Sequence, residues 1–140
     1  MGRALAASLA ALALAGCSRD DEADLPAACR LGADAVQTAL ADAPERVRLE
    51  GDTALSECLT RTSEQADVLL VGEVYTAAAS RLADDDDAVA VGYLLGAVRR
   101  GAGETQGIHD ELVRRLEQEA GRLEDRAALS RGERAGLASG

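Results

Sequence analysis

The sequence predicts an all-α fold, and three observations support this prediction. Apolar residues recur every three or four positions through most of the chain, which is the period of an amphipathic helix. Pro44 and a run of aspartates at 84–87 divide this pattern into three segments. No segment has the convincing pattern of a β-strand. We therefore expect a short N-terminal helix that is linked by a disulfide to a long antiparallel hairpin of two helices.

The first two of these helices are expected in the N-terminal half of the domain. The first is expected over 26–43, with Pro26 in its first turn and Pro44 directly after its end. The second is expected over 52–83. Apolar residues lie on two of its faces, so we expect it to be the central helix, in contact with both of its neighbours.

The third helix is expected over 88–123, after four aspartates at 84–87 that form a turn and cap it. Its glycines recur at intervals of four, seven and four residues, which places them on one side: Gly92, Gly96, Gly103 and Gly107. We expect close packing there against small residues of the second helix: Gly72, Thr76, Ala79 and Ala83. A kink or break is the alternative, because glycine costs about 1 kcal/mol in a helix interior.

Length and charge limit what the domain can be. The 140 residues leave room for one domain, expected over 26–123, while the small and polar residues 124–140 are expected to form a disordered or frayed tail. The formal net charge of −10 argues against a nucleic-acid partner, because phosphate binding needs a clustered basic face. Tyr75 and Tyr93 are the only aromatic residues, which largely excludes aromatic platforms for sugars or bases.

Residues 1–16 have the layout of a secretory signal peptide, with a basic residue at Arg3, a short apolar run at 4–15 and small residues at the end. As a helix the apolar run would be about 18 Å long, too short to cross a hydrocarbon core of about 30 Å. Cleavage after Ala15, as in an ordinary secreted protein, and cleavage before Cys17 are both open. An uncleaved cytosolic start is a third possibility.

The residues LAGC at 14–17 resemble the lipobox of bacterial lipoproteins. The resemblance implies that the Cys17 thiol receives a diacylglyceryl group and that Cys17 becomes the new N-terminus. Cysteine parity favours this reading, because ordinary secretion would leave one of the three cysteines unpaired in an oxidising compartment. Two or three acyl chains would hold the protein stably on a bilayer. Residues 17–25 would then be a lipidated tether, in which the eight residues 18–25 reach ~28 Å at most.

The residue after the lipobox cysteine bears on which membrane carries the protein. In lipoproteins an aspartate at that position tends to retain the protein in the inner membrane, and this chain has Ser18 there. The resemblance therefore implies the outer membrane in a two-membrane host. In a one-membrane host it implies the outer face of the cytoplasmic membrane.

The other two cysteines, Cys29 and Cys58, are expected to form a disulfide. It would contribute about 3–4 kcal/mol in the chain-entropy model. A tight hairpin of the expected helices would hold the two residues some 20 Å apart, whereas a disulfide needs Cα atoms within about 7 Å. Either the first helix is shorter than 26–43, or the connection at 44–52 runs back along it. Two separate buried thiols are the alternative.

No catalytic, cofactor-binding or metal site is expected. His109 is the only histidine, and a lone histidine on an amphipathic helix is expected at the surface or the core boundary. The aspartates at 84–87 lack the spacing and the glycine of an EF-hand loop. Glu73 is expected on the exposed side of the second helix.

We therefore expect a non-enzymatic, lipid-anchored envelope protein. The bilayer would be its partner through acylated Cys17. The helical domain would act as an interaction or structural module, on another envelope protein or on a second copy of itself. The alternative is a carrier of a small ligand or cation, with the glycine-rich middle of the third helix as a pocket wall.

Overall fold

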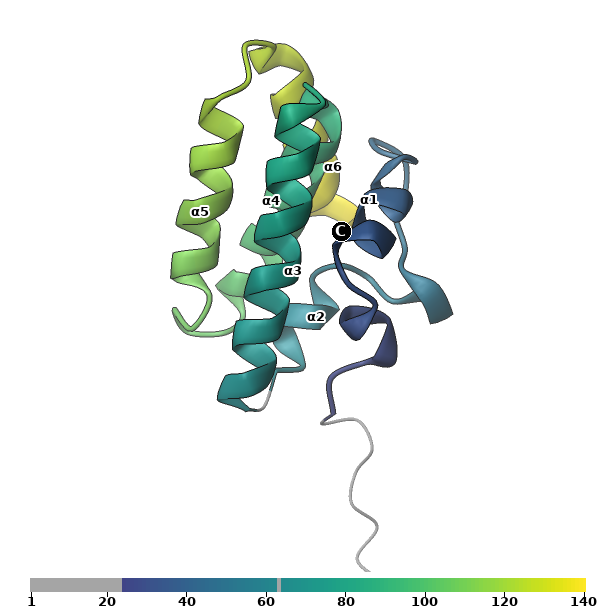
Figure 1. Cartoon of the computed structure of the whole chain (residues 1–140), viewed down its shortest axis with the longest axis vertical. Helices are drawn as coiled ribbons and strands as arrows, with labels where there is room; N and C mark the ends of the chain where they lie inside the picture. Colours follow the sequence, from purple (N-terminus) through teal and green to yellow (C-terminus); the bar gives the residue numbers. More distant parts are fainter. Residues whose placement is uncertain (1–23, 63) are drawn as a thin grey trace, which may run out of the picture.

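The computed structural model describes residues 24–62 and 64–140, and all regular elements in these ranges are helices (Figure 1). The all-α class is therefore confirmed for the described part of the chain. The predicted signal peptide at 1–16, Cys17 and most of the predicted tether lie outside these residues. The elements, in chain order, are η2 (Ala27–Arg30), α1 (Ala33–Leu40), η3 (Glu50–Asp52), α2 (Glu57–Thr60), α3 (Gln65–Asp84), α4 (Ala88–Gly103), α5 (Asp110–Gly121) and α6 (Arg126–Ser139).

The four long helices α3 to α6 form a bundle in which α4 is the central element. Helix α4 contacts α3, α5 and α6, and also α1 and α2. The expectation that residues 52–83 form the central helix is therefore wrong. The sequence of α4, AVAVGYLLGAV over its first eleven residues, is apolar on all sides, as in a helix that is buried around its circumference. Within the described residues, no helix is both long enough and apolar enough to cross a membrane.

Each of the three expected helices is divided in the structure. The expected helix at 26–43 is split by Gly32, whose φ of +91° lies in the left-handed region that favours glycine. The expected helix at 52–83 consists of the short α2 and the separate α3. The expected helix at 88–123 breaks between α4 and α5, where Gln106 and Gly107 have φ values of +53° and +89°. This break, the alternative raised by the glycines, replaces the expected two-helix hairpin with the three bundle helices α3, α4 and α5.

The expectation of a disordered tail at 124–140 is also wrong, because residues 126–139 form α6. The Asp125 side chain caps this helix by accepting a hydrogen bond of 2.8 Å from the Ala128 amide. Helix α6 offers few large apolar side chains, which is why its sequence resembles a loop. It packs instead through its backbone.

Helices α4 and α6 run in the same direction and pack through facing glycines. A Cβ atom built on Gly92 or Gly96 would lie 2.1 or 2.2 Å from a carbonyl oxygen of α6. A Cβ atom on Gly132 or Gly136 would lie 2.1 or 2.0 Å from a carbonyl oxygen of α4. This is the small-xxx-small arrangement that lets helix backbones touch. The glycines do permit close packing, but against α6 and not against the expected residues of α3.

Two buried tyrosines hold the irregular segment 41–56 against the bundle. The Tyr75 hydroxyl on α3 donates a hydrogen bond of 2.7 Å to the Leu55 carbonyl. The Tyr93 hydroxyl on α4 accepts one of 3.1 Å from the Val47 amide. Both side chains are fully buried, and burial raises the pKa of the Tyr75 phenol. Neither ring is available as an aromatic binding platform.

Candidate functional site

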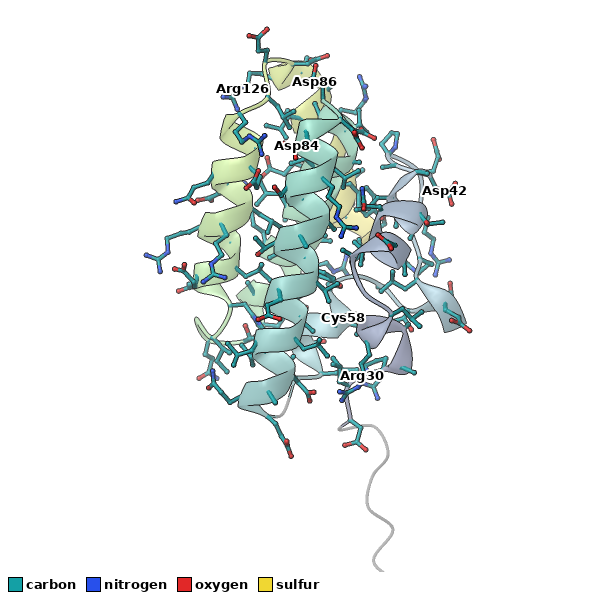
Figure 2. All side chains as sticks on the ribbon, viewed as in Figure 1. Arg30, Asp42, Cys58, Asp84, Asp86 and Arg126 are labelled. Carbon is teal, nitrogen blue, oxygen red and sulfur yellow. A yellow bond between two sulfur atoms is a disulfide. The ribbon has the colours of Figure 1, made fainter. Side chains whose placement is uncertain are left out.

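Cys29 and Cys58 are bonded to each other through their sulfur atoms, with 5.5 Å between the Cα atoms. Cys29 lies in η2 and Cys58 lies in α2. Figure 2 labels Cys58, which lies beside the N-terminal elements. Both explanations that would bring the two cysteines together apply: the first helix is shorter than expected, and the connection after it runs back along it. Helix α1 begins only at Ala33, after Cys29, and the segment 41–56 returns the chain to α2. The bridge is covered, since both cysteines are at most 2% exposed.

His109 lies just before α5 and is 1% exposed, so the expectation of a surface or boundary histidine is wrong. Its Nε2 atom is 3.1 Å from the Leu59 carbonyl oxygen and 3.2 Å from the Thr62 hydroxyl. Because a carbonyl can only accept, the hydrogen-bond network assigns the ring proton to Nε2. The imidazole thus ties the α4–α5 connection to α2. Burial lowers the pKa of His109, against a smaller opposite effect of the Leu59 hydrogen bond.

This lowered pKa makes the stability of the protein depend on pH. The folded state holds neutral His109, whereas the unfolded chain takes up a proton near its ordinary pKa of about 6.5. The His109 contribution is therefore complete above that pH and is lost as the pH falls through the folded-state pKa. We expect the free energy of unfolding of wild type, minus that of His109→Gln, to decrease between pH 7.5 and pH 5.5. Urea denaturation of both proteins at both pH values measures this difference. A difference that does not change with pH would contradict the prediction.

The aspartate run forms the expected turn between α3 and α4. Asp86 has a φ of +59°, and the Asp87 side chain accepts a hydrogen bond of 3.0 Å from the Ala90 amide, which confirms the predicted cap. Asp84 pairs with Arg122, the residue that follows the end of α5. Figure 2 shows Asp84 and Asp86 at the same end of the bundle as Arg126. Among residues 24–62 and 64–140, no group of three or more histidine, cysteine or acidic side chains could hold a metal ion.

A groove of about 370 Å³ lies between the first half of α3 and the start of α5. Its apolar lining includes Leu69 and Ile108, which are 58% and 60% exposed. Gly72 lies in the wall of the groove, and a Cβ atom there would meet nothing within 4 Å. Glu73 belongs to the polar part of the lining and is exposed, as predicted. The groove is therefore an open apolar strip with charged edges.

Sequence reasoning did not find this groove. Leu69 and Ile108 lie at apolar positions of the helical patterns at 52–83 and 88–123, and such positions favour cover by a neighbouring helix. The break between α4 and α5 instead places Ile108 in a connection, where it is exposed. The signal that could have found it is the cluster of Gly103, Gln106 and Gly107 immediately before Ile108.

Comparison with known proteins gives no relative, because no family model, no curated protein and no solved structure matches the chain.

Proposed function

We propose that the chain is a bacterial envelope lipoprotein, held on a bilayer by acylated Cys17, whose helical domain acts by contact and not by catalysis. The observation that carries the proposal is the pairing of Cys29 with Cys58. The sequence has three cysteines, so this bridge leaves Cys17 as the one thiol for modification. Cys17 is also the last residue of the lipobox-like LAGC. The covered bridge suits an oxidising compartment outside the cytosol.

The environment of His109 supports a domain that acts by binding a partner and not as an enzyme. A general base needs a nitrogen that a substrate can reach. His109 lines the groove, but it is only 1% exposed and its Nε2 already bonds to the Leu59 carbonyl. The exposed apolar strip with Leu69 and Ile108 is the surface that we propose for contact, because large apolar side chains that are more than half exposed gain most from being covered.

The shape of the same groove favours a second candidate function, the binding of a small apolar ligand. Its volume of about 370 Å³ falls within the roughly 300–1,000 Å³ of small-molecule sites. The glycines of the expected pocket wall at 99–107, which are Gly101, Gly103 and Gly107, are not among the residues that line this groove. A ligand that raises the melting temperature of wild type, but not of Gly72→Leu, would favour this candidate.

We expect Cys17→Ser to abolish membrane retention, because the acyl chains on Cys17 supply the proposed anchor. The measurement is fractionation of the native host followed by a high-salt wash of the membranes. The double variant Cys29→Ala/Cys58→Ala is the control and should remain in the membrane fraction. The anchor is wrong if Cys17→Ser still pellets with the washed membranes.

A further inference from the structure

Four chain segments meet at one end of the bundle, which we call the tether pole: residues 24–30, 57–62, 64–69 and 104–109. The Arg30 guanidinium donates to the Asp67 carboxylate at 3.0 Å, which fixes η2 to the first turn of α3. The Cys29–Cys58 bridge joins η2 to α2, and His109 joins the α4–α5 connection to α2. The described chain begins at this pole, where Figure 2 labels Arg30.

The tether pole carries exposed apolar side chains, and the opposite pole does not. Leu69 and Ile108 both belong to the tether pole and line the same groove. The two ends carry similar charge, because the tether pole has five acidic side chains and two arginines, and residues 84–87 and 122–126 at the opposite pole have six acidic side chains and two arginines. Among the described residues, none of the exposed large apolar side chains lies in those two ranges. The two ends of the bundle therefore differ in what they can contact.

The length of the tether decides which end faces the bilayer. Leu25 is 4% exposed and belongs to the folded domain, so eight residues, 17–24, separate the proposed lipid attachment from the domain. Fully extended, these residues reach ~28 Å. Helix α3 has 20 residues and is therefore about 30 Å long. To bring the opposite pole to the membrane, the tether would have to run fully extended along the whole bundle, so the tether pole is the end that is held nearest to the bilayer.

We infer that the tether pole lies on the lipid bilayer, with Ile108 and Leu69 among the headgroups and the upper acyl chains. The inference rests on the proposed anchoring at Cys17. Lipid is favoured over a protein as the cover of this surface, because the tether keeps the bilayer within reach of the pole at all times. Covering the two exposed side chains would orient the domain without adding much to the strength of the anchor.

The test uses the mature, lipidated protein in vesicles of phosphatidylethanolamine and phosphatidylglycerol. Ile108→Cys carries an environment-sensitive fluorophore, and Asp86→Cys at the opposite pole is the matched control. The new thiol is the only free one, because Cys17 is acylated and the other two cysteines are bonded. We expect a blue-shifted emission at residue 108. Quenching by spin-labelled lipids should be roughly twofold or more stronger there than at residue 86.

The possible results separate the inference from the anchor on which it rests. Protein that floats with the vesicles, but is quenched equally at both positions, overturns the inference and leaves the anchor standing. A blue shift at residue 108 without lipid quenching also overturns it, because another protein surface then covers the groove. Protein that does not float with the vesicles overturns the anchor and the inference together. Circular dichroism of both labelled variants checks that the fold is intact.

Discussion

Replacing Gly136 with alanine is expected to lower the free energy of unfolding by about 3 kcal/mol, the upper part of the range for overpacking. The new methyl group would lie 2.0 Å from the Tyr93 carbonyl oxygen, which belongs to the backbone of α4 and cannot turn aside. Helices α4 and α6 would have to separate. Tyr93 and Leu94, both fully buried, would then lose contacts. Chemical denaturation followed by circular dichroism measures the effect.

The matched control for this prediction is Gly72→Ala in α3. A methyl group there would meet nothing within 4 Å, so the substitution should only improve helix propensity. We expect it to stabilise the protein by about 0.5–1 kcal/mol. Should Gly136→Ala prove as stable as Gly72→Ala, the close contact of α4 with α6 is wrong.

Removing the Cys29–Cys58 bridge is expected to cost about 3–4 kcal/mol, because 29 positions separate the two cysteines and their closure restricts the unfolded chain. The loss should concentrate in residues 24–62, where the helices η2, α1, η3 and α2 are all short and depend on their attachment to the bundle. Hydrogen exchange of reduced and oxidised protein should show faster exchange there and smaller changes in α4.

A comparison of Cys29→Ala/Cys58→Ala with wild type, with and without reductant, completes this test. Reductant should lower the denaturation midpoint of wild type and leave the double variant unchanged. Mass spectrometry of exported protein, alkylated without reduction, should find neither thiol modified. Equal midpoints for reduced and oxidised wild type would show that the bridge does not stabilise the fold.

The features that the sequence predicted correctly depend on local signals. The helical class follows from apolar spacing, and the cap by Asp87 follows from an acidic residue directly before an apolar run. The pairing of Cys29 with Cys58 could be anticipated from parity, although the predicted helix bounds placed the two residues too far apart. The short α1 and the return of residues 41–56 resolve that difference.

The features that could not be predicted from the sequence depend on contacts between segments that are distant in the chain. Residues 124–140 have little apolar surface, which predicts a disordered tail and not α6. Gly132 and Gly136, however, repeat the four-residue spacing of Gly92 and Gly96. That shared spacing was the available signal. The burial of His109 was missed for a similar reason. Its acceptor, the Leu59 carbonyl, is 50 residues away in the chain, and nothing beside His109 indicates it.

The pairing of α4 with α6 also affects when folding can be completed during synthesis. The ribosome makes α4 before the helix that covers its glycine face, so a nascent chain has an open core until residues 126–139 exist. The latest residues also reach back to the earlier segment, since the Arg48 guanidinium donates to the Ser139 carbonyl at 2.6 Å. A nascent chain therefore lacks the contacts that cover the glycine face of α4 until α6 has been synthesised.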